Sequence, residues 1–471
     1  MDGAPRHDRT PHENDVHSRL NPTRHARIFA PRHADDLSEL LQAARRQHRR
    51  IAVAGARHAM GGQQFAEGGW LIDTRALDGI LDFDAVGGRV RVAAGIRWPA
   101  LQDFLAAQRD RQGRGWSIRQ KQTGADDFSL GGALAANIHG RGLDMAPFVD
   151  DIEAFTLVKP DGAIVIVDRE REPQLFALAV GGYGLFGVVV DLTLRLAPRR
   201  IVRRRVDLLR RRELAAAFAQ ARDDGAQYGD FQFAIDPADD DFLDLGVFAR
   251  YEPLAEGGPP ETPARHLSAD DWRTLLSLAH TDKREAFRRY SAFYLATDGQ
   301  RYGSDDHQFG VYLDGYHDAI DATLGHTGSE MITELYVPLA DLDAFLGRVA
   351  DDCRRHDTDL VYGTVRLIRR DRETVLAWAR EDWACIVLNL HVHHDADRRA
   401  RMRADLQRLI DRALQFGGSF YLTYHREARA DQLRAAYPHI DRFLAAKDRH
   451  DPDGVLDSDW HRAVRATLSA T

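Results

Sequence analysis

Three glycine-rich segments, separated by strand-like and helix-like patterns, constrain this chain more than any other feature. They cover residues 55–63 (GARHAMGGQ), 122–140 (QTGADDFSLGGALAANIHG) and 180–190 (VGGYGLFGVVV). Glycine lets a backbone N–H approach a phosphate closely and adopts positive φ readily, so clusters at strand ends indicate an anion cradle. Each cluster alone also fits a tight turn. Their order and spacing carry the argument.

The glycine pattern is not one of the common nucleotide fingerprints. A Rossmann fingerprint needs GxGxxG directly after the first strand and an acidic residue about twenty positions later, and this chain has no such arrangement. It also has no Walker motif. A phosphate cradle built from these loops therefore belongs to another class of cofactor-binding fold.

Length and charge exclude several classes of protein. A chain of 471 residues predicts two domains, or one domain with a large insert. The net charge of −8 argues against general nucleic-acid binding, which needs a basic surface. We find no signal peptide and no transmembrane segment, and we expect a cytoplasmic protein whose residues 1–23 form a flexible tail.

The two cysteines, Cys353 and Cys385, are too few for a disulfide framework, and neither lies at zinc-ligand spacing. We expect both to be buried. No metal site is predicted from them.

Hydrophobic periodicity predicts an α+β fold. Residues 35–50 read as a surface helix with Leu37, Leu40, Leu41 and Ala44 on one face, and residues 79–95 read as a hairpin around Gly87 and Gly88. Later segments, such as residues 359–368 and 383–392, alternate apolar and polar side chains. That alternation is typical of an antiparallel sheet with one face on helices and the other over a ligand.

Residues 31–63, 129–142 and 175–198, taken together, resemble the FAD-binding domain of the vanillyl-alcohol-oxidase and p-cresol-methylhydroxylase superfamily. In that family the pyrophosphate of FAD lies on the first glycine loop and on the Ser-Leu-Gly-Gly segment. The resemblance implies a two-part FAD-binding domain, formed by residues 24–199 and by the C-terminal segment 421–471. Residues 200–420 would form a substrate (cap) domain, with an antiparallel sheet covered by helices.

His58 is the single residue that supports the resemblance most specifically. It matches the position at which several relatives bond a histidine covalently to the flavin, although Ala59 stands where they usually have serine. The resemblance implies FAD as cofactor, with attachment through His58 or a non-covalent pocket histidine as the alternatives. By the same match, the cofactor would be bordered by Gly55, Ala56, Arg57, His58, Ala59, Gly62, Gln63, Gly124, Ser129, Gly131, Gly132, Asn137, His139, Gly140, Val188 and Tyr421.

The C-terminal stretch 416–460 resembles decaprenylphosphoryl-ribose 2-oxidases and, more loosely, sugar-lactone and alditol oxidases. In those enzymes a strand delivers a tyrosine to the flavin and, three residues later, a lysine over the ring. Tyr421 matches the tyrosine, but Tyr424 replaces the lysine and His425 follows. Adjacent strand residues face opposite sides, so we expect only one of the two to reach the ring, with Tyr424 favoured.

Further substrate-face candidates lie on the later strands. Glu334 matches a glutamate that alditol and lactone oxidases aim at a polyol hydroxyl, although Tyr336 replaces the arginine that follows it there. Arg366, with Asn389 and His391, could face the substrate or merely hydrogen-bond on a wet sheet face. The histidines His391 and His393 could also suggest a metal, but without a second ligand set we expect none.

The predicted reaction is oxidation of an alcohol group, in a sugar, polyol or sugar lactone, by hydride transfer to FAD. Tyr424, His425 and His391 are the candidate bases for the hydroxyl proton. Oxygen or another acceptor would reoxidise the cofactor. Two alternatives remain: a reductase of carbon–carbon double bonds with a nicotinamide donor, and a flavin-fold protein that binds a ligand without turnover.

Overall fold

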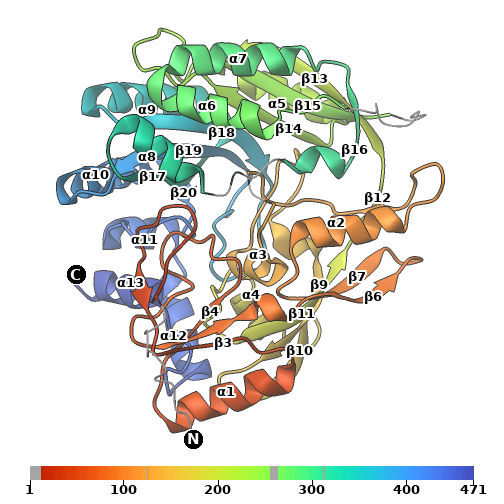
Figure 1. Ribbon diagram of the computed structural model, residues 1–471, viewed down its shortest axis with the longest axis vertical. Coiled ribbons are helices and arrows are strands. Elements are labelled where there is room, and N and C mark those ends of the chain that lie inside the picture. Colours follow the sequence, from red (N-terminus) through yellow and green to blue (C-terminus); the bar gives the residue numbers. More distant parts are fainter. Residues whose placement is uncertain (1–11, 125, 255–263, 311–312, 314, 471) are drawn as a thin grey trace, which may run out of the picture.

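A computed structural model describes residues 12–470, apart from residues 125, 255–263, 311–312 and 314. Helices and mainly antiparallel sheets make it an α+β structure, as the sequence predicts. Figure 1 shows two stacked parts, with an eight-stranded sheet and its helices above two smaller sheets. Among the described residues, no helix combines the length and apolarity that crossing a membrane requires.

The first small sheet is parallel and carries the first glycine-rich segment at its edge. Its order is β3 (Arg27–Phe29), β5 (Trp70–Asp73) and β4 (Ile51–Ala54). Helix α1 (Ala34–Arg46) links β3 to β4 and buries Leu37, Leu41 and Ala44, while Leu40 is only partly covered. The predicted helical face is therefore confirmed, and the chain turns into the glycine-rich segment directly after β4.

The second small sheet is antiparallel and holds the other glycine-rich segments. The predicted Gly-Gly hairpin joins its last two strands, and Gly88 adopts φ +65° there. The strands, in order, are β10 (Ile164–Asp168), β9 (Ile152–Val158), β11 (Val188–Arg195), β7 (Arg89–Ala93) and β6 (Ile80–Asp84). Three helices accompany it: α2 (Trp98–Ala107), α3 (Leu130–Ala136) and α4 (Pro173–Ala179). A two-stranded pair, β8 (Trp116–Ser117) with β12 (Ala197–Pro198), leads to the upper part.

The large sheet is antiparallel throughout. Its order is β16 (Arg301–Gly303), β13 (Ile201–Arg210), β15 (Leu245–Pro253), β14 (Tyr228–Phe233), β18 (Leu360–Ile368), β19 (Trp383–His393), β17 (Gly328–Val337) and β20 (Ser419–Phe420). The helices around it are α5 (Leu214–Asp223), α6 (Ala269–Thr281), α7 (Lys283–Leu295), α8 (Tyr316–Leu324), α9 (Leu342–His356) and α10 (Ala396–Gln415). Both cysteines are buried, Cys353 in α9 and Cys385 in β19, as expected.

The N-terminal segment differs from the expected flexible tail. Residues 1–11 lie outside the described residues, but residues 12–23 pack against the body through β1 (His12–Glu13) and β2 (Thr23–Arg24). The buried Asp15 accepts hydrogen bonds from the backbone N–H groups of His17 and Ser18, and Ser329 donates its hydroxyl to the Ser18 carbonyl at 2.5 Å. Polar turns rather than an apolar run hold this segment, so hydrophobic periodicity does not reveal it.

The C-terminal helices return to the first small sheet. They are α11 (Ala430–Ala436), α12 (Ile440–His450) and α13 (Asp459–Ser469). Between α12 and α13 the chain runs beside β4: Ile51 N–H donates to Val455 O at 2.7 Å, and Asp457 N–H donates to Ile51 O at 2.9 Å. The first and last parts of the described chain thus share one sheet edge.

Candidate active site

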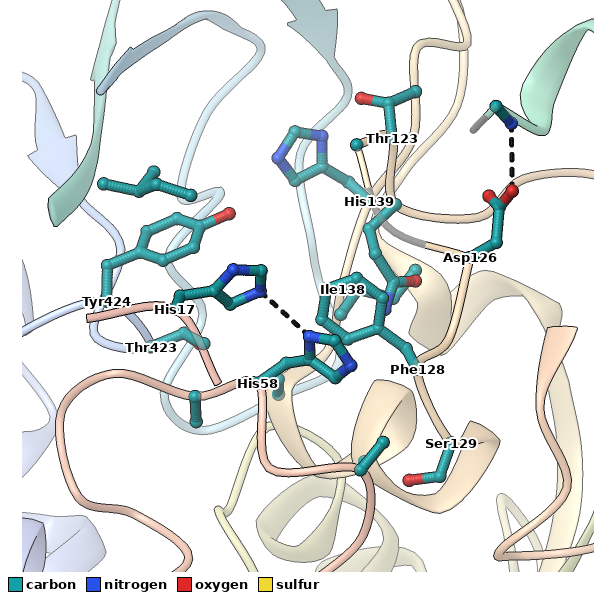
Figure 2. A pocket seen from close by; sticks show the side chains of 18 of the residues that line it. His17, His58, Thr123, Asp126, Phe128, Ser129, Ile138, His139, Thr423 and Tyr424 are labelled. Carbon is teal, nitrogen blue, oxygen red and sulfur yellow. Dashed lines mark hydrogen bonds between the residues drawn. The ribbon is translucent and has the colours of Figure 1, made fainter. Parts of the chain in front are cut away.

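A cavity of about 750 Å³ lies where the glycine-rich segments face the large sheet. Figure 2 shows side chains that line it, including His58 and Ser129 from the glycine-rich segments and Tyr424 from the C-terminal segment. Most predicted cofactor residues line this cavity: Gly55, Ala56, Arg57, His58, Ala59, Gln63, Gly124, Ser129, Gly131, Gly132, His139 and Tyr421. The remaining four, Gly62, Asn137, Gly140 and Val188, lie behind the wall rather than in it.

The first two glycine-rich segments touch each other at one end of the cavity. A Cβ atom on Gly55 would lie 2.0 Å from the hydroxyl oxygen of Ser129, and one on Gly131 would lie 3.0 Å from the carbonyl oxygen of Ala94. The Ser129 side chain at Gly55 and the Ala94 backbone at Gly131 therefore come this close only because side chains are missing at the two glycines. This is the geometry that a diphosphate held by main-chain N–H groups requires.

Asn137 shows why a motif residue can matter without reaching the cavity. Its φ of +49° ends α3 in the left-handed region, which asparagine tolerates better than most residues. Its side chain donates to Asp371 at 3.0 Å and accepts from the Val149 N–H at 2.9 Å. Asn137 therefore shapes the turn that carries His139 into the cavity.

His58 pairs with a histidine from the N-terminal segment. Its Nδ1 lies 2.9 Å from Nε2 of His17, a contact drawn as a dashed line in Figure 2. The ring of Phe128 lies 4.0 Å from that of His58, centroid to centroid. Burial lowers the pKa of His17 to about 4, and burial, with His17 beside it, lowers the pKa of His58 well below its usual value. Both rings are therefore neutral near pH 7, and a neutral imidazole is the nucleophilic form.

The stretch predicted as a strand around Tyr421 leaves the sheet after Phe420. Tyr421 N–H still donates to the Glu334 carbonyl, but Leu422 O accepts from the Gln63 side chain at 2.7 Å and Thr423 O accepts from Met60 N–H at 3.1 Å. The backbone hydrogen bonds of this loop go to the first glycine-rich segment instead of the sheet. The loop ties the two parts together and places Tyr421 and Tyr424 in the cavity wall.

Glu334 lies at the centre of a buried polar cluster in the cavity wall. It accepts hydrogen bonds from His139 Nε2 at 2.5 Å, from the Tyr336 hydroxyl at 2.6 Å and from the Cys385 thiol at 3.2 Å. Burial alone would raise the pKa of Glu334, but the adjacent His139 and the hydrogen bonds lower it to about 2. Glu334 is therefore a carboxylate, and much of its hydrogen-bonding capacity is already used inside the protein.

His139 faces two acceptors. Its Nδ1 lies 3.0 Å from the backbone carbonyl of Gly140, and its Nε2 lies against the Glu334 carboxylate. Both of these partners are hydrogen-bond acceptors, and the two contacts fix the orientation of the ring. The cavity wall thus contains a buried pair of His139 and Glu334, with His139 at the end of the second glycine-rich segment.

Four neighbouring strands of the large sheet present polar side chains to the cavity. Gln232 comes from β14, Arg366 from β18, Asn389 from β19 and Glu334 from β17. Among the described residues, Arg366 Nε, Asn389 Oδ1 and Gln232 Oε1 are buried without a hydrogen-bond partner. Buried polar atoms are nearly always paired in native proteins, so these atoms indicate a polar ligand in the cavity.

Two sequence candidates lie outside the cavity wall. His425 is buried beside Phe420, contacts the Thr333 hydroxyl at 3.2 Å, and burial lowers its pKa to about 4, so it carries no charge near pH 7. His391 lies two residues beyond Asn389 toward the end of β19, outside the residues that line the cavity. The strand alternation does place Asn389 in the cavity, and of the three candidate bases only Tyr424 lines it.

Sequence reasoning missed several residues in or behind the wall. His17 lies in the segment taken as a tail, and Glu330 lies four residues before Glu334 on the same face of β17. Lys121 is fully buried and pairs with Asp126 at 2.6 Å, while the half-buried Arg141 pairs with Asp230 at 3.2 Å. Arg141 could have been found from the sequence, because it directly follows the NIHG motif. The places of His17, Glu330 and Lys121 in the site depend on contacts with residues far away in the sequence.

Comparison with known proteins decides the nature of the lower part. Residues 25–168 match the family model described as FAD binding domain. This part of the chain is therefore similar to FAD binding domains. FAD is its cofactor, and the resemblance seen in the glycine-rich segments is confirmed for this part of the chain.

The chain is also similar to named relatives over part of its length. It is 32% identical over 178 residues to D-arabinono-1,4-lactone oxidase of Eremothecium gossypii, which covers 36% of this chain and 31% of the relative. It is 29% identical over 186 residues to L-galactono-1,4-lactone dehydrogenase 2 of Oryza sativa subsp. japonica, covering 40% and 29%. D-arabinono-1,4-lactone oxidase of Saccharomyces cerevisiae is 27% identical over 180 residues, covering 36% and 32%. The matched segment thus spans about a third of each relative.

Proposed function

We propose that this chain uses FAD to oxidise an alcohol group of a sugar lactone, or of a related sugar or polyol. One observation carries the proposal: the cavity walled by the FAD binding domain also reaches the unpartnered polar atoms of Gln232, Arg366 and Asn389. A ligand rich in hydroxyl groups supplies donors and acceptors for all three. The names of the relatives, which are lactone oxidases and dehydrogenases, support the same substrate class.

The proposal divides the chain into two working parts. Residues 24–199 and 421–471 hold FAD, and residues 200–420 form a substrate domain built on the large sheet. The pairing of Ile51 with Val455, and the loop that joins Gln63 to Leu422, support this division. A site at such a boundary is common for small-molecule enzymes.

FAD, when bound, accepts the hydride and supplies the redox chemistry. Arg366 would place positive charge beside the cavity and so stabilise an anionic flavin, which is the task of the lysine missing at Tyr424. Burial raises the pKa of Tyr424 well above its usual value, so its phenol keeps its proton and would donate a hydrogen bond to the substrate oxygen. Glu334, ionised in the same wall, would hold His139 and Tyr336 in place through its hydrogen bonds.

Anaerobic reduction of the flavin tests the reaction class. We expect sugar-1,4-lactones or polyols to bleach the visible absorption of the bound FAD, and NADPH to leave it unchanged. Bleaching by NADPH alone would replace the proposal with the double-bond reductase. Bound flavin that no alcohol and no nicotinamide reduces would replace it with the ligand-binding alternative.

A further inference from the structure

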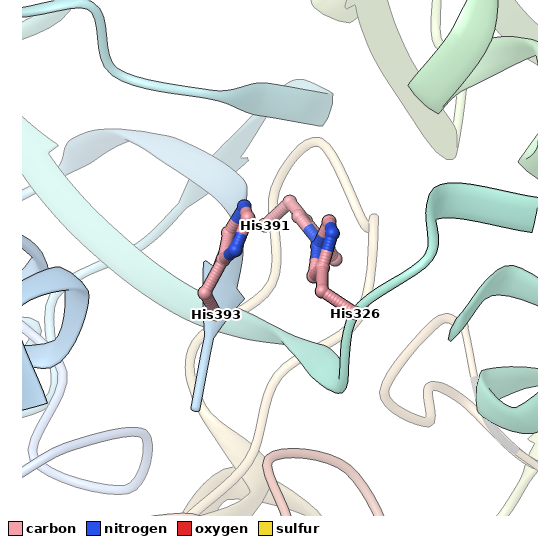
Figure 3. A group of neighbouring side chains, drawn as sticks. All are labelled: His326, His391 and His393. Carbon is pink, nitrogen blue, oxygen red and sulfur yellow. The ribbon is translucent and has the colours of Figure 1, made fainter. Parts of the chain in front are cut away.

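A group of histidines lies at the end of the large sheet, outside the residues that line the 750 Å³ cavity. His391 and His393 share one face at the end of β19, and His326 precedes the first residue of β17. Figure 3 shows the three side chains gathered there. The sequence pointed only to His391 and His393 as a possible metal-binding pair. The fold adds His326, which lies 65 residues before His391 in the chain.

The nitrogen atoms converge. One ring nitrogen of each histidine lies within 4.8 Å of those of the others. His326 Nε2 is 2.9 Å from His391 Nε2, and the rings of His326 and His393 stack at 3.5 Å between centroids. Ligand nitrogens 2.0–2.1 Å from a tetrahedral Zn²⁺ would lie roughly 3.3 Å apart. Because the planes of His326 and His393 are 7° from parallel, one of these two rings must turn to point its nitrogen at a shared ion.

The second nitrogens of two of these rings differ in their contacts. His326 Nδ1 lies 3.3 Å from the Leu324 carbonyl, whereas His391 Nδ1 is buried without a hydrogen-bond partner, since the Glu330 carboxylate is 3.9 Å away. The 2.9 Å contact between His326 Nε2 and His391 Nε2 brings two possible ligand atoms together.

The surroundings of the three histidines favour metal binding over close packing of the side chains without a ligand. Metal-binding histidines usually donate their other N–H to a carboxylate or a backbone carbonyl, as His326 is placed to do with the Leu324 carbonyl. A Cβ atom on Gly328 would lie 2.6 Å from Cε1 of His391, so glycine makes room for that ring. A second cavity of about 250 Å³, lined by His391 and His393, gives a metal and its remaining water ligand access.

We propose that His326, His391 and His393 bind one divalent transition-metal ion, with Zn²⁺ as the ion that the all-imidazole ligand set favours. The ion fixes the start of β17 against the end of β19. Through His391 it also fixes Glu330, whose carboxylate faces the 750 Å³ cavity and accepts a hydrogen bond from His280 at 3.1 Å. The site is structural and independent of the proposed oxidation.

Zinc content of the FAD-loaded protein tests the proposal. After equilibration with Zn²⁺ and removal of the excess, we expect about one zinc per chain by mass spectrometry of the metal. His326→Ala and His393→Ala should each abolish stable binding, and Glu330→Gln should weaken it by about 10–100-fold. His356→Ala, which removes an equally half-buried histidine from the end of α9, should leave the zinc content unchanged.

Flavin content and thermal melting without zinc show whether each variant is folded, and His393 is exposed enough for alanine to be tolerated. Co²⁺ gives a second measurement on the unaltered protein. Tetrahedral Co²⁺ should add intense absorption to the red of the flavin bands, and weak six-coordinate bands would contradict the site. A wild-type protein that retains no zinc, or a His326→Ala/His393→Ala double variant that retains as much as wild type, would overturn the proposal.

Discussion

Nε2 of His17 and Nδ1 of His58 lie 2.9 Å apart although 41 residues separate them in the chain. His58 can bond to a flavin carbon only if it loses a proton, and His17 is a neutral acceptor at hydrogen-bond distance.

This contact predicts the fate of the cofactor in acid. Peptide mass analysis after acid precipitation should find a flavin adduct on the peptide that contains His58, and His58→Ala should release all of the FAD. His17→Ala should slow attachment by on the order of 10²-fold, because it removes a proton acceptor. The exposed control His439→Ala should attach FAD normally. A yellow supernatant from the wild type would reject the covalent bond and leave FAD binding intact.

Arg366 predicts a rate effect. Arg366→Met should slow anaerobic reduction of the flavin by substrate on the order of 10²-fold, because a fixed positive charge no longer stabilises the reduced ring. Arg369→Met, on the same chain segment but exposed, is the matched control. Stopped-flow absorbance measures both. Equal rates for Arg366→Met and wild type would remove Arg366 from the site.

Glu334 predicts a pH dependence of stability. Its pKa is about 2 in the folded protein against an ordinary 4.5, so its contribution is complete above about pH 5 and is lost as the pH falls toward 2. The shift corresponds to about 3 kcal/mol of unfolding free energy. Urea unfolding of Glu334→Gln should show that loss at pH 7 and a flatter decline below pH 5. Glu39→Gln, exposed on α1, should follow the wild type, and an unchanged slope for Glu334→Gln would contradict the assignment.

Gly131 predicts a loss of cofactor affinity. A Cβ atom there would lie 2.9 Å from the Ala94 side chain and 3.0 Å from its carbonyl, so Gly131→Ala must push α3 away from the turn after β7. Overpacking of this kind typically destabilises by about 1–3 kcal/mol, and we expect FAD binding to weaken about tenfold or more. Fluorescence titration measures it. Gly115→Ala, where the nearest atom lies at 3.6 Å, should bind FAD as the wild type does.

The sequence predicted what depends on local pattern. The buried face of α1, the hairpin at Gly88 and the glycine-rich FAD loops follow from periodicity and from residues that only certain backbones tolerate. Strand alternation likewise brought Arg366 and Asn389 to one face, although it could not say that His391 lies beyond the cavity.

What the sequence could not show depends on contacts between distant residues. His139 meets Glu334 across 195 positions, and neither residue carries a sign of its partner. Tyr421 reads as strand, but its neighbours Leu422 and Thr423 find backbone and side-chain partners on the first glycine loop, and these outweigh strand propensity. The orientation of His139 against Glu334 follows only from that tertiary contact.

The pairing of Ile51 with Val455 and Asp457 has a consequence for biosynthesis. A nascent chain that has left the ribosome only as far as residue 450 contains all three glycine-rich segments, but it lacks the segment that runs beside β4. It also lacks Trp460, whose N–H donates to the carbonyl of Gly62 in the first glycine-rich segment at 3.3 Å. Cofactor capture should therefore wait until residues 455–460 have docked, and a chain stalled before them should emerge colourless.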